Sequence, residues 1–241
     1  MNLLKEFALN DKCSYLKGRE TLTHYKIIDN CSSKNCQDLI ERGYRRFGKM
    51  YFRPICADCN ECQSIKIDVD NFSFSKSQKR VLKKASHVTS YIQRPTLSKT
   101  HLELFEKYHL NMHDRKGWDY QETSPQHYQN SFVSGHNEFG YEILYFDDDK
   151  LIGVDLIDIL EDGISSIYFY YDPDYNHLAL GKLSLYNQIL FAKQKSTKWI
   201  YLGYYVEDCP SLSYKSHYKP YLTLKGRPSE YDEFEWLYST R

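Results

Sequence analysis

The sequence predicts an α+β fold in which helices flank a mixed β-sheet. Its order of elements predicts this fold, because three strand-like segments precede the longest helical segment and one more strand follows that helix. The cysteines are a second feature of the chain, since six of the seven lie before residue 63.

Length and composition are those of a globular chain. The 241 residues fit one large domain or two small ones, and 41% are hydrophobic while 27% are charged. No apolar run approaches the ~18 residues of a membrane-spanning helix. The first residues mix charges with apolar side chains, so we expect no signal peptide and a cytoplasmic location.

The elements of the first half are short. Residues 36–42 are expected to form a helix that ends at Gly43, and residues 66–69 and 88–93 two strands. Ser75 and Ser98 are the expected N-caps of two further helices, because a serine side chain can accept a hydrogen bond from a free amide of the first turn. The second of these helices runs to about residue 112.

The second half shows clearer periodicity. Residues 141–146, 151–159 and 164–171 alternate as three antiparallel strands with turns between them. Residues 180–195 form the best helix, and residues 199–205 form a strand after it. Ser211 starts a short helix, and residues 218–224 form a last strand. The expected apolar face of the long helix consists of Leu183, Tyr186, Leu190 and Phe191.

This strand order is that of the second half of acetyl-coenzyme A-dependent N-acetyltransferases. In that fold the loop before the long helix carries glycines that cradle a pyrophosphate at the helix N-terminus. Here the loop reads DPDYNHLALGK, with Gly181 as its one glycine and with acids nearby. This loop is poorly suited to bind the pyrophosphate of coenzyme A, so we expect the acyl group to arrive on another carrier.

The charges are unevenly distributed, although 32 basic and 32 acidic residues give a net charge of zero. Residues 71–102 contain no Asp or Glu. Their basic residues fall at helical spacing on one face: Lys76, Lys79, Arg80, Lys83 and Lys84. Such a face is either simply solvated or neutralised by an anion such as a phosphate backbone, and the missing acids favour the anion.

A second basic cluster lies in the segment RGYRRFGKMYFRP, where aromatic residues alternate with basic ones. Charge next to aromatic surfaces is typical of proteins that bind RNA ends or single strands. The basic members are Arg42, Arg45, Arg46, Lys49 and Arg53.

The strongest local motif is C-x₂-C-x₂-C at Cys56, Cys59 and Cys62. Closely spaced thiolates can converge on zinc or on an iron–sulfur cluster. Cys13 is our choice for a fourth ligand, with Cys31 and Cys36 as alternatives. Cys209 is expected to be a packed thiol, and buried free thiols remain the alternative for all seven.

Eight segments in order resemble the bacterial aspartate/glutamate leucyltransferases, the short relatives of eukaryotic arginyl-tRNA–protein transferases. They are CSYLKGR, GYRRFG, YFRPICADCNEC, FSFSKSQKR, DILEDGISSIYFYYDP, LALGKLSLYNQ, YLGYYVEDC and SYKSHYKP, and they span Cys13 to Pro220. The family implies an N-acetyltransferase-like (GNAT-type) fold with an N-terminal cysteine-bearing subdomain. We expect this cysteine-rich subdomain over residues 1–70 and the acyltransferase domain over residues 71–241. The family also implies that an aminoacyl-tRNA donates its amino acid to the N-terminal amine of a protein that begins with Asp or Glu, which is then degraded through the N-degron pathway. No cofactor is required for this transfer, coenzyme A and membranes are not partners, and a structural zinc or iron–sulfur cluster is the possible metal centre.

The expected site residues follow from that reaction. An activated ester needs an oriented amine, stabilisation of the oxyanion and movement of one proton. The candidates for this chemistry are Asp158, Tyr168, Tyr170, Tyr204 and Tyr214. The candidates for tRNA phosphates are Arg42, Lys79, Arg80, Lys83, Lys84 and Lys215. An acidic acceptor side chain calls for a bidentate arginine, and Arg45, Arg46 and Arg115 are the candidates.

Three other readings stay open at this stage. A coenzyme A-dependent N-acetyltransferase is disfavoured by the loop before the long helix. A metal-containing RNA-binding module without transferase activity explains only the first ~90 residues. An arginyl donor in place of leucyl would need a buried carboxylate in its pocket.

Overall fold

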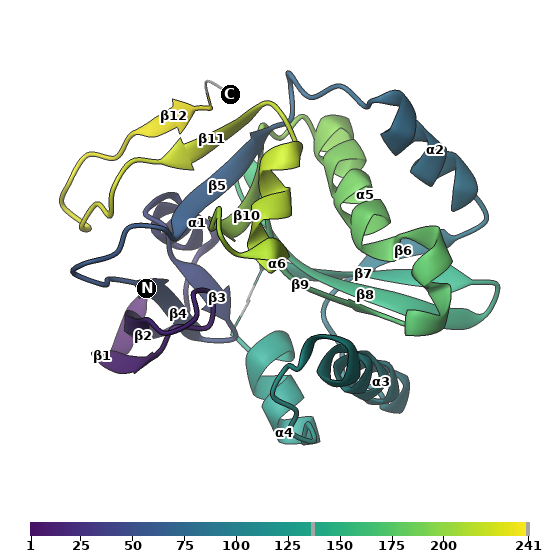
Figure 1. The fold of residues 1–241 in the computed structure, drawn as a ribbon, viewed down its shortest axis with the longest axis horizontal. Coiled ribbons are helices and arrows are strands. Elements are labelled where there is room, and N and C mark those ends of the chain that lie inside the picture. Colours follow the sequence, from purple (N-terminus) through teal and green to yellow (C-terminus); the bar gives the residue numbers. More distant parts are fainter. Residues whose placement is uncertain (136–137, 240–241) are drawn as a thin grey trace.

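The computed structural model describes residues 1–135 and 138–239, which form two β-sheets with helices around the larger one (Figure 1). The smaller sheet is antiparallel and has the order β1 (Asn2–Lys12), β2 (Glu20–Asp29), β4 (Met50–Pro54), β3 (Arg45–Phe47). The larger sheet has the order β12 (Trp236–Tyr238), β11 (Tyr221–Leu224), β5 (Gln63–Asp68), β10 (Trp199–Tyr205), β9 (Gly163–Tyr171), β8 (Lys150–Ile159), β7 (Gly140–Asp147), β6 (Thr89–Gln93). The expected α+β class with a mixed sheet is confirmed.

Helices cover both faces of the larger sheet. One face carries α2 (Lys76–Lys84) and α5 (Leu180–Lys195), and the other carries α3 (Lys99–Lys116) and α4 (Pro125–Tyr128) (Figure 1). The remaining helical segments are α1 (Ser33–Glu41), α6 (Pro210–Ser213), a π-helical turn over Gln129–Val133, and 3₁₀ turns over Pro173–Leu178 and Tyr214–His217. The apolar cores therefore lie on each side of the sheet, as in a three-layer arrangement.

Most elements predicted from the sequence are present. The bounds of α5 and β10 are the expected ones, and β7, β8 and β9 differ by a residue or two at their ends. Ser75 caps α2 through a capping box with Gln78, and Ser98 accepts a hydrogen bond from the amide of His101 at the start of α3. The predicted apolar face of α5 was wrong at one position. Leu190 is 42% exposed, whereas Leu185 and Ile189, which were not predicted to face the core, are buried.

The two sheets are not separated at residue 70. β5 pairs antiparallel with both β10 and β11, so a strand of the expected N-terminal subdomain lies inside the larger sheet. The smaller sheet takes its strands from residues 2–54, and its strand β3 contacts β9 of the larger sheet. This contact brings β3 next to the middle of the molecule.

The only parallel pair among the described strands is β9 with β10, joined by α5. The two strands pair only where Gly163–Ser165 meet Trp199–Tyr201. Beyond that point each strand carries a bulge: Ile167 has no partner on β8, and Leu202 has none on β5. Because bulges bend and twist a strand, β9 and β10 part from each other and open the sheet.

Candidate functional site

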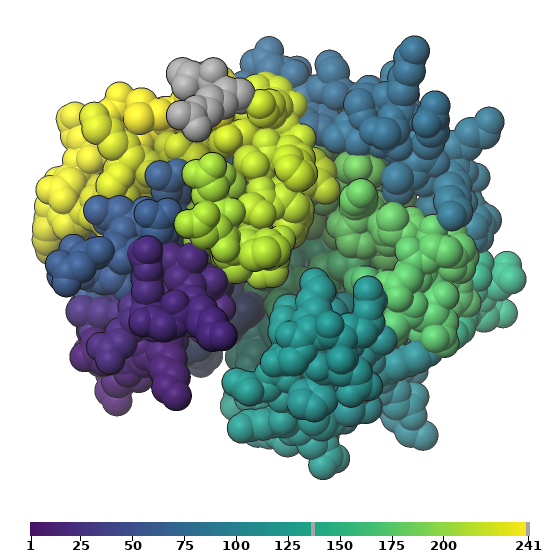
Figure 2. Space-filling view, viewed as in Figure 1, coloured from purple at the N-terminus to yellow at the C-terminus, as the bar shows by residue number. Residues whose placement is uncertain are grey.

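A large cleft of about 860 Å³ lies at the open ends of these strands. It is walled by the first residues of α2 and α5, the end of α3, Tyr171 of β9 and the segment 210–219. Figure 2 shows the hollow between the segment around residue 215 and the surfaces of α3 and α5. The cleft therefore lies where the long helix begins, beside the parted strands.

The cleft is basic and aromatic. Its basic side chains are Lys116, Lys182, His217 and Lys219, and its aromatic ones include Tyr108, Trp118, Tyr171 and Tyr214. Among the described residues, no Asp or Glu lines it. The N-cap residue of α5, Ala179, provides no side-chain cap, so the first amides of the helix add positive potential to the same cavity. Such a surface suits a phosphate-bearing ligand with a flat base.

Two buried or half-buried cations hold the parted strands. The Arg45 guanidinium donates to the Ile167 carbonyl of β9 at 3.0 Å. The Lys215 ammonium donates to the carbonyls of Leu202 and Tyr204 in β10, both at 2.7 Å. These carbonyls lie beyond the last residues that pair β9 with β10. The cations thus take the place of ladder hydrogen bonds that the parting removes.

Gly203 allows Arg45 to reach this position. Its backbone has φ +73°, and an added Cβ would lie 2.5 Å from Arg45 Nε. Burial and then the nearby Arg45 guanidinium lower the pKa of Lys215 well below its usual value. In the part of the chain that the structure describes, no carboxylate forms an ion pair with Arg45. Arg45 is therefore a partly exposed cation whose charge is not neutralised within the protein.

A second cavity of about 850 Å³ adjoins the other face of β9. Its lining is mostly apolar: Ile27, Phe47, Met50, Phe105, Phe132 and Tyr168. Its ionisable side chains are Lys49, His109 and His127, and none of its described lining residues is a carboxylate. The cavity and the cleft share walls, because α3 and β9 contribute residues to both.

Asp158 and Arg46 are brought together, away from both cavities. Arg46 Nε donates to Asp158 Oδ2 at 2.9 Å and Nη2 to Oδ1 at 2.5 Å, and both side chains are buried. The third donor of Arg46 bonds the Gly48 carbonyl at 2.7 Å. This bidentate pair uses its charges internally, so neither group is presented to a substrate.

The four tyrosines that the sequence selected have different surroundings. Tyr170 is buried and its hydroxyl lies 2.5 Å from that of Tyr128. Tyr204 is buried too, with its hydroxyl 3.1 and 3.0 Å from the carbonyls of Gly43 and Phe52. Tyr168 and Tyr214 line the apolar cavity and the cleft. Only the last two hydroxyls are therefore placed at cavities.

Sequence reasoning missed His109, which contacts Tyr168. The Tyr168 hydroxyl and His109 Nε2 are 2.8 Å apart, and the rings stack with an interplanar angle of 9°. Burial raises the pKa of Tyr168 and lowers that of His109. The two residues are 59 positions apart, so no local pattern connects them.

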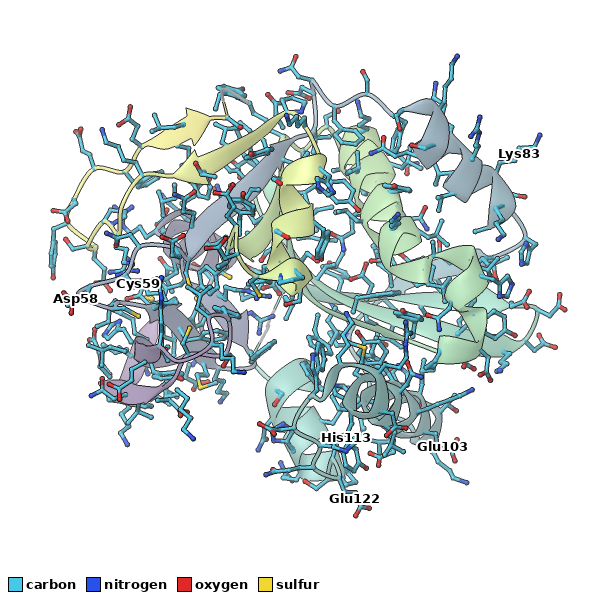
Figure 3. The ribbon with its side chains drawn as sticks, viewed as in Figure 1. Asp58, Cys59, Lys83, Glu103, His113 and Glu122 are labelled. Carbon is cyan, nitrogen blue, oxygen red and sulfur yellow. The ribbon has the colours of Figure 1, made fainter. Side chains whose placement is uncertain are left out.

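The basic residues expected to bind tRNA lie in three places. The stripe on α2 is fully exposed, and in Figure 3 Lys83 extends outward from that helix. Arg42 bonds the carbonyls of Glu230 and Asp232 at 3.2 Å each. Lys215 is buried, as described above. The acceptor candidate Arg115 is exposed near the end of α3.

The four predicted metal ligands share one neighbourhood. Cys13, Cys59 and Cys62 pack against Leu16 and Val206, and Cys56 lies beside Thr21. Burial, then the thiols of Cys13, Cys59 and Cys56, raise the pKa of Cys62 to about 12. In Figure 3 Cys59 lies on the opposite side of the molecule from Lys83.

Four thiols are the type of ligand that zinc and iron–sulfur clusters prefer, but here the four sulfur atoms do not point to one common position. The amide of Leu16 and the guanidinium of Arg19 donate to Cys13 and Cys59 at 3.4 Å, as donors commonly do to thiolate ligands. Within residues 1–135 and 138–239, however, no three Cys, His, Asp or Glu side chains are placed to hold one ion. None of the described helices combines the length and apolarity needed to cross a membrane.

Two family models match the chain. The model "Arginine-tRNA-protein transferase, N terminus" matches residues 11–80, and the model "Arginine-tRNA-protein transferase, C terminus" matches residues 100–225.

The chain is also similar to curated proteins named aspartate/glutamate leucyltransferase. One from Campylobacter jejuni is 49% identical over 219 residues, which are 91% of this chain and 92% of that protein. One from Helicobacter hepaticus is 41% identical over 236 residues, 98% of each chain. Among solved structures, FemX aligns with a TM-score of 0.44 at 9% identity, over 76% of this chain and 63% of the other.

Proposed function

The chain belongs to the arginine-tRNA-protein transferase family, in its aspartate/glutamate leucyltransferase branch, and we propose that its central cleft is where the transfer takes place. It is an aminoacyltransferase that moves leucine from leucyl-tRNA to the N-terminal amine of proteins that begin with Asp or Glu. The new N-terminal leucine marks those proteins for N-degron degradation. The observation that carries the proposed location is the basic and aromatic cleft at the parted strands, whose described lining contains no carboxylate.

The 3′ end of the tRNA is proposed to occupy the cleft. Lysines and the uncapped start of α5 would neutralise its terminal phosphates, and Trp118 and Tyr214 offer flat surfaces to its bases. The first residues of α2 line the same cleft, so its basic stripe continues the track outward along the acceptor stem. Such contacts position a nucleic acid without reading its sequence. Arg42 and Lys215 fit this role less well, since both already bond protein carbonyls.

The leucyl side chain is proposed to enter the apolar cavity on the other face of β9. Burying an aliphatic side chain among Phe105, Phe132 and Met50 is favourable by roughly 1.5–3 kcal/mol. An arginyl side chain would need a carboxylate there, and the described lining has none. This difference favours leucine as the donor amino acid.

The acidic side chain of the acceptor is proposed to bind Arg45. This guanidinium lies between β9 and β10, bonds one backbone carbonyl and keeps its remaining donors. An arginine can bind a carboxylate with two parallel hydrogen bonds. Arg46 has that interaction already with Asp158, and Arg115 lies at the outer end of α3.

The chemical step needs little beyond orientation. The ester of leucyl-tRNA is activated, and the α-amine of the acceptor has a pKa near 7.7–8.0, so a substantial fraction is neutral at physiological pH. Holding amine and carbonyl in contact replaces a bimolecular encounter by an internal reaction. Tyr168 and Tyr214 are the proposed catalytic hydroxyls, because Tyr170, Tyr204 and Asp158 bond other protein groups in the interior.

The proposal also includes the fold type of the larger sheet, the role of the cysteines and the cellular location. The parallel pair β9/β10 joined by α5, opened by a bulge, supports an N-acetyltransferase-type fold for the larger sheet. The cysteines at positions 13, 56, 59 and 62 lie close together but are not arranged around one ion here, and they are the proposed ligands of a structural zinc or iron–sulfur cluster. Binding of that group would draw their thiols together and fix the loop that holds them. The protein is proposed to act in the cytoplasm, where aminoacyl-tRNA is present.

A transfer assay tests this function. Purified protein is given radiolabelled leucyl-tRNA or arginyl-tRNA together with peptides that begin with Asp, Glu, Ala or Lys. We expect label from leucyl-tRNA only, and only on the Asp and Glu peptides. Label from arginyl-tRNA would contradict the proposed donor pocket. No label from either donor, in folded protein with its cysteines reduced, would contradict the transferase itself.

A further inference from the structure

Tyr168 and His109 form a hydrogen-bonded pair at the edge of the apolar cavity, and this pair carries an inference about proton movement. Tyr168 follows directly after the bulged residue Ile167, and Ser165 is the last residue of β9 that pairs with β10. Its side chain lies on the face of β9 that α3 covers, and there its hydroxyl reaches His109 at 2.8 Å. Tyr168 thus lies three residues beyond the point where the sheet opens.

The proton positions in the pair follow from its partners. His109 Nδ1 lies 2.8 Å from the Phe105 carbonyl, and a carbonyl oxygen can only accept. Nδ1 therefore carries the proton of the neutral ring, and Nε2 has the free lone pair. The Tyr168 O–H must donate to that lone pair, which leaves the oxygen of Tyr168 free to accept a hydrogen bond from a ligand.

The surroundings keep the imidazole neutral. His109 packs against the Phe105 and Trp118 rings, and burial lowers its pKa. The ionisable groups that face it are Tyr108 on its own helix and Tyr168 on β9, while Lys49 and His127 line the same cavity. Among the described residues, no carboxylate pairs with it. A neutral histidine is the form that can take a proton.

We propose that His109, acting through the hydroxyl of Tyr168, accepts the proton of the attacking amine and returns it to the leaving ribose oxygen. This inference rests on the proposed function, since it assigns the proton transfer of that same reaction. Of the five residues first selected for the chemistry, Tyr168 is the one whose hydroxyl both reaches a cavity and bonds a base.

The step balances in atoms and charge. As the C–N bond forms, an amine proton moves to the Tyr168 oxygen while the Tyr168 proton moves to His109 Nε2. When the C–O ester bond breaks, the ribose oxygen takes a proton from Tyr168, and His109 returns its proton to Tyr168. Tyr168 is the catalytic residue in this scheme, and His109 is a positioning and proton-storing residue behind it.

The variants H109Q and Y168F separate proton transfer from packing. The glutamine oxygen can still accept a hydrogen bond from Tyr168, but an amide has no basicity near neutral pH. Y168F keeps the ring and removes the hydroxyl. General acid–base catalysis contributes typically 10²–10⁴-fold, so we expect each variant to lower the single-turnover rate at least 100-fold. The double variant should be no slower than the slower single one.

The pH profile, extended downward to about pH 4, gives the deciding readout. In the wild type, both the amine and His109 must be neutral, so a plot of log rate against pH should steepen from slope 1 to slope 2 below the pKa of His109, which burial lowers. In H109Q and Y168F only the amine titrates, and the slope should be 1. H87Q, which changes an exposed histidine paired with Asp147, is the matched control and should keep the rate and the slope of the wild type.

The possible outcomes are distinct. An H109Q enzyme with the wild-type rate, or a slower one whose slope is unchanged, would overturn the inference while leucyl transfer by the wild type upholds the function. A wild type that transfers no leucine would overturn both. If H109Q does not fold, Y168F decides by the same two criteria.

Discussion

The stretch where β9 pairs with β10 and the stretch where they part treat charge in opposite ways. Near the paired stretch, Arg46 binds Asp158 and Lys66 binds Glu41, with all four side chains largely buried. At the parted stretch, Arg45 and Lys215 donate to backbone carbonyls, and neither forms an ion pair with a described carboxylate. Arg45 and Arg46 are adjacent on β3, yet Arg46 pairs with a carboxylate and Arg45 bonds a backbone carbonyl.

This difference teaches how one short strand serves two purposes. Successive side chains of a strand point to opposite sides, so β3 directs one guanidinium into the interior and the next toward the opening. The inner charge is neutralised and holds the sheets together. The outer guanidinium bonds a backbone carbonyl and has no carboxylate partner among the described residues. Its positive charge is therefore available to a ligand.

The largest effect is expected from breaking the inner pair. R46M leaves the buried Asp158 carboxylate without its partner, and losing one partner of a buried pair costs roughly 3–5 kcal/mol. We expect urea unfolding to show a loss of that size in the free energy of unfolding. The double variant R46M/D158L removes both charges and should recover most of it. A single variant as stable as the wild type would mean that the pair is not structural.

The next largest effect is expected from the outer arginine, and on activity. R45M removes the proposed partner of the acceptor carboxylate, so kcat/KM for an Asp-initiated peptide should fall about 100-fold, or about 2.7 kcal/mol. The loss should appear mainly in KM, and R45K should restore only part of it, because an ammonium cannot bind a carboxylate with a planar fork. The free energy of unfolding should change by no more than about 1 kcal/mol. An R45M enzyme with an unchanged KM would show that Arg45 does not bind the acceptor carboxylate.

A third case sharpens the contrast, because Asp155 is buried and forms no ion pair with any cation that the structure describes. Its carboxylate accepts hydrogen bonds from Ser184 and Gln188 at 2.7 and 2.8 Å, and burial raises its pKa to about 7. The unfolded chain has a pKa near 3.9 for aspartate. Between these two values the folded protein holds one more proton, so the contribution of Asp155 to stability falls as pH rises from about 4 to about 7.

D155N should remove this pH dependence. At pH 8 we expect the variant to exceed the wild type by about 2 kcal/mol in the free energy of unfolding, since the amide carries no charge. The difference should shrink toward pH 5, where the wild-type side chain is protonated in the folded state. Chemical denaturation at both pH values measures it. A difference that grows toward pH 5 would contradict the assigned direction.

The smallest effect is expected at the outer surface. Replacing Lys79, Arg80 and Lys83 of α2 by glutamine removes charges that are exposed and form no ion pairs in the described structure. We expect affinity for leucyl-tRNA to fall about tenfold near 0.1 M salt, with a shallower dependence on salt. Binding should be measured at several salt concentrations, with K34Q/K225Q as the control at a distance from the cleft lining. Equal salt slopes for variant and wild type would remove α2 from the tRNA track.

The sequence predicted the second half of the fold well because its apolar segments are long and are separated by clear turns. The strands β7 to β10 and α5 run over seven to sixteen residues, and β8 and β10 are buried along almost their whole length. β1 was missed because nearly all of its residues are exposed, which leaves no alternating pattern to detect. The hairpin of β1 and β2 is held by backbone pairing, which a sequence does not display.

The sequence predicted which types of residue form the candidate site better than it predicted how those residues are placed and paired. Sequence selected the basic α2, Tyr168 and Arg45. The start of α2 and Tyr168 line the cleft and the apolar cavity, and Arg45 lies at the parted strands, where it bonds the Ile167 carbonyl. It assigned Arg46 and Asp158 to substrate contact, because a two-residue alternation within β3 does not reveal which side faces the interior. His109 was absent from the prediction, since its partner comes from another element and only tertiary packing joins them.

The place of β5 in the larger sheet has a consequence for synthesis on the ribosome. Its neighbours β10 and β11 come much later in the chain, since Asp68 pairs with Trp199, 199 − 68 = 131 positions on. At roughly 5–20 residues per second, β5 waits on the order of ten seconds before either neighbour emerges. During that time its edges offer unpaired amides and carbonyls to any passing strand. The nascent chain is therefore a natural client for chaperones over this interval, and slowing translation between β5 and β10 should lower the yield of folded protein.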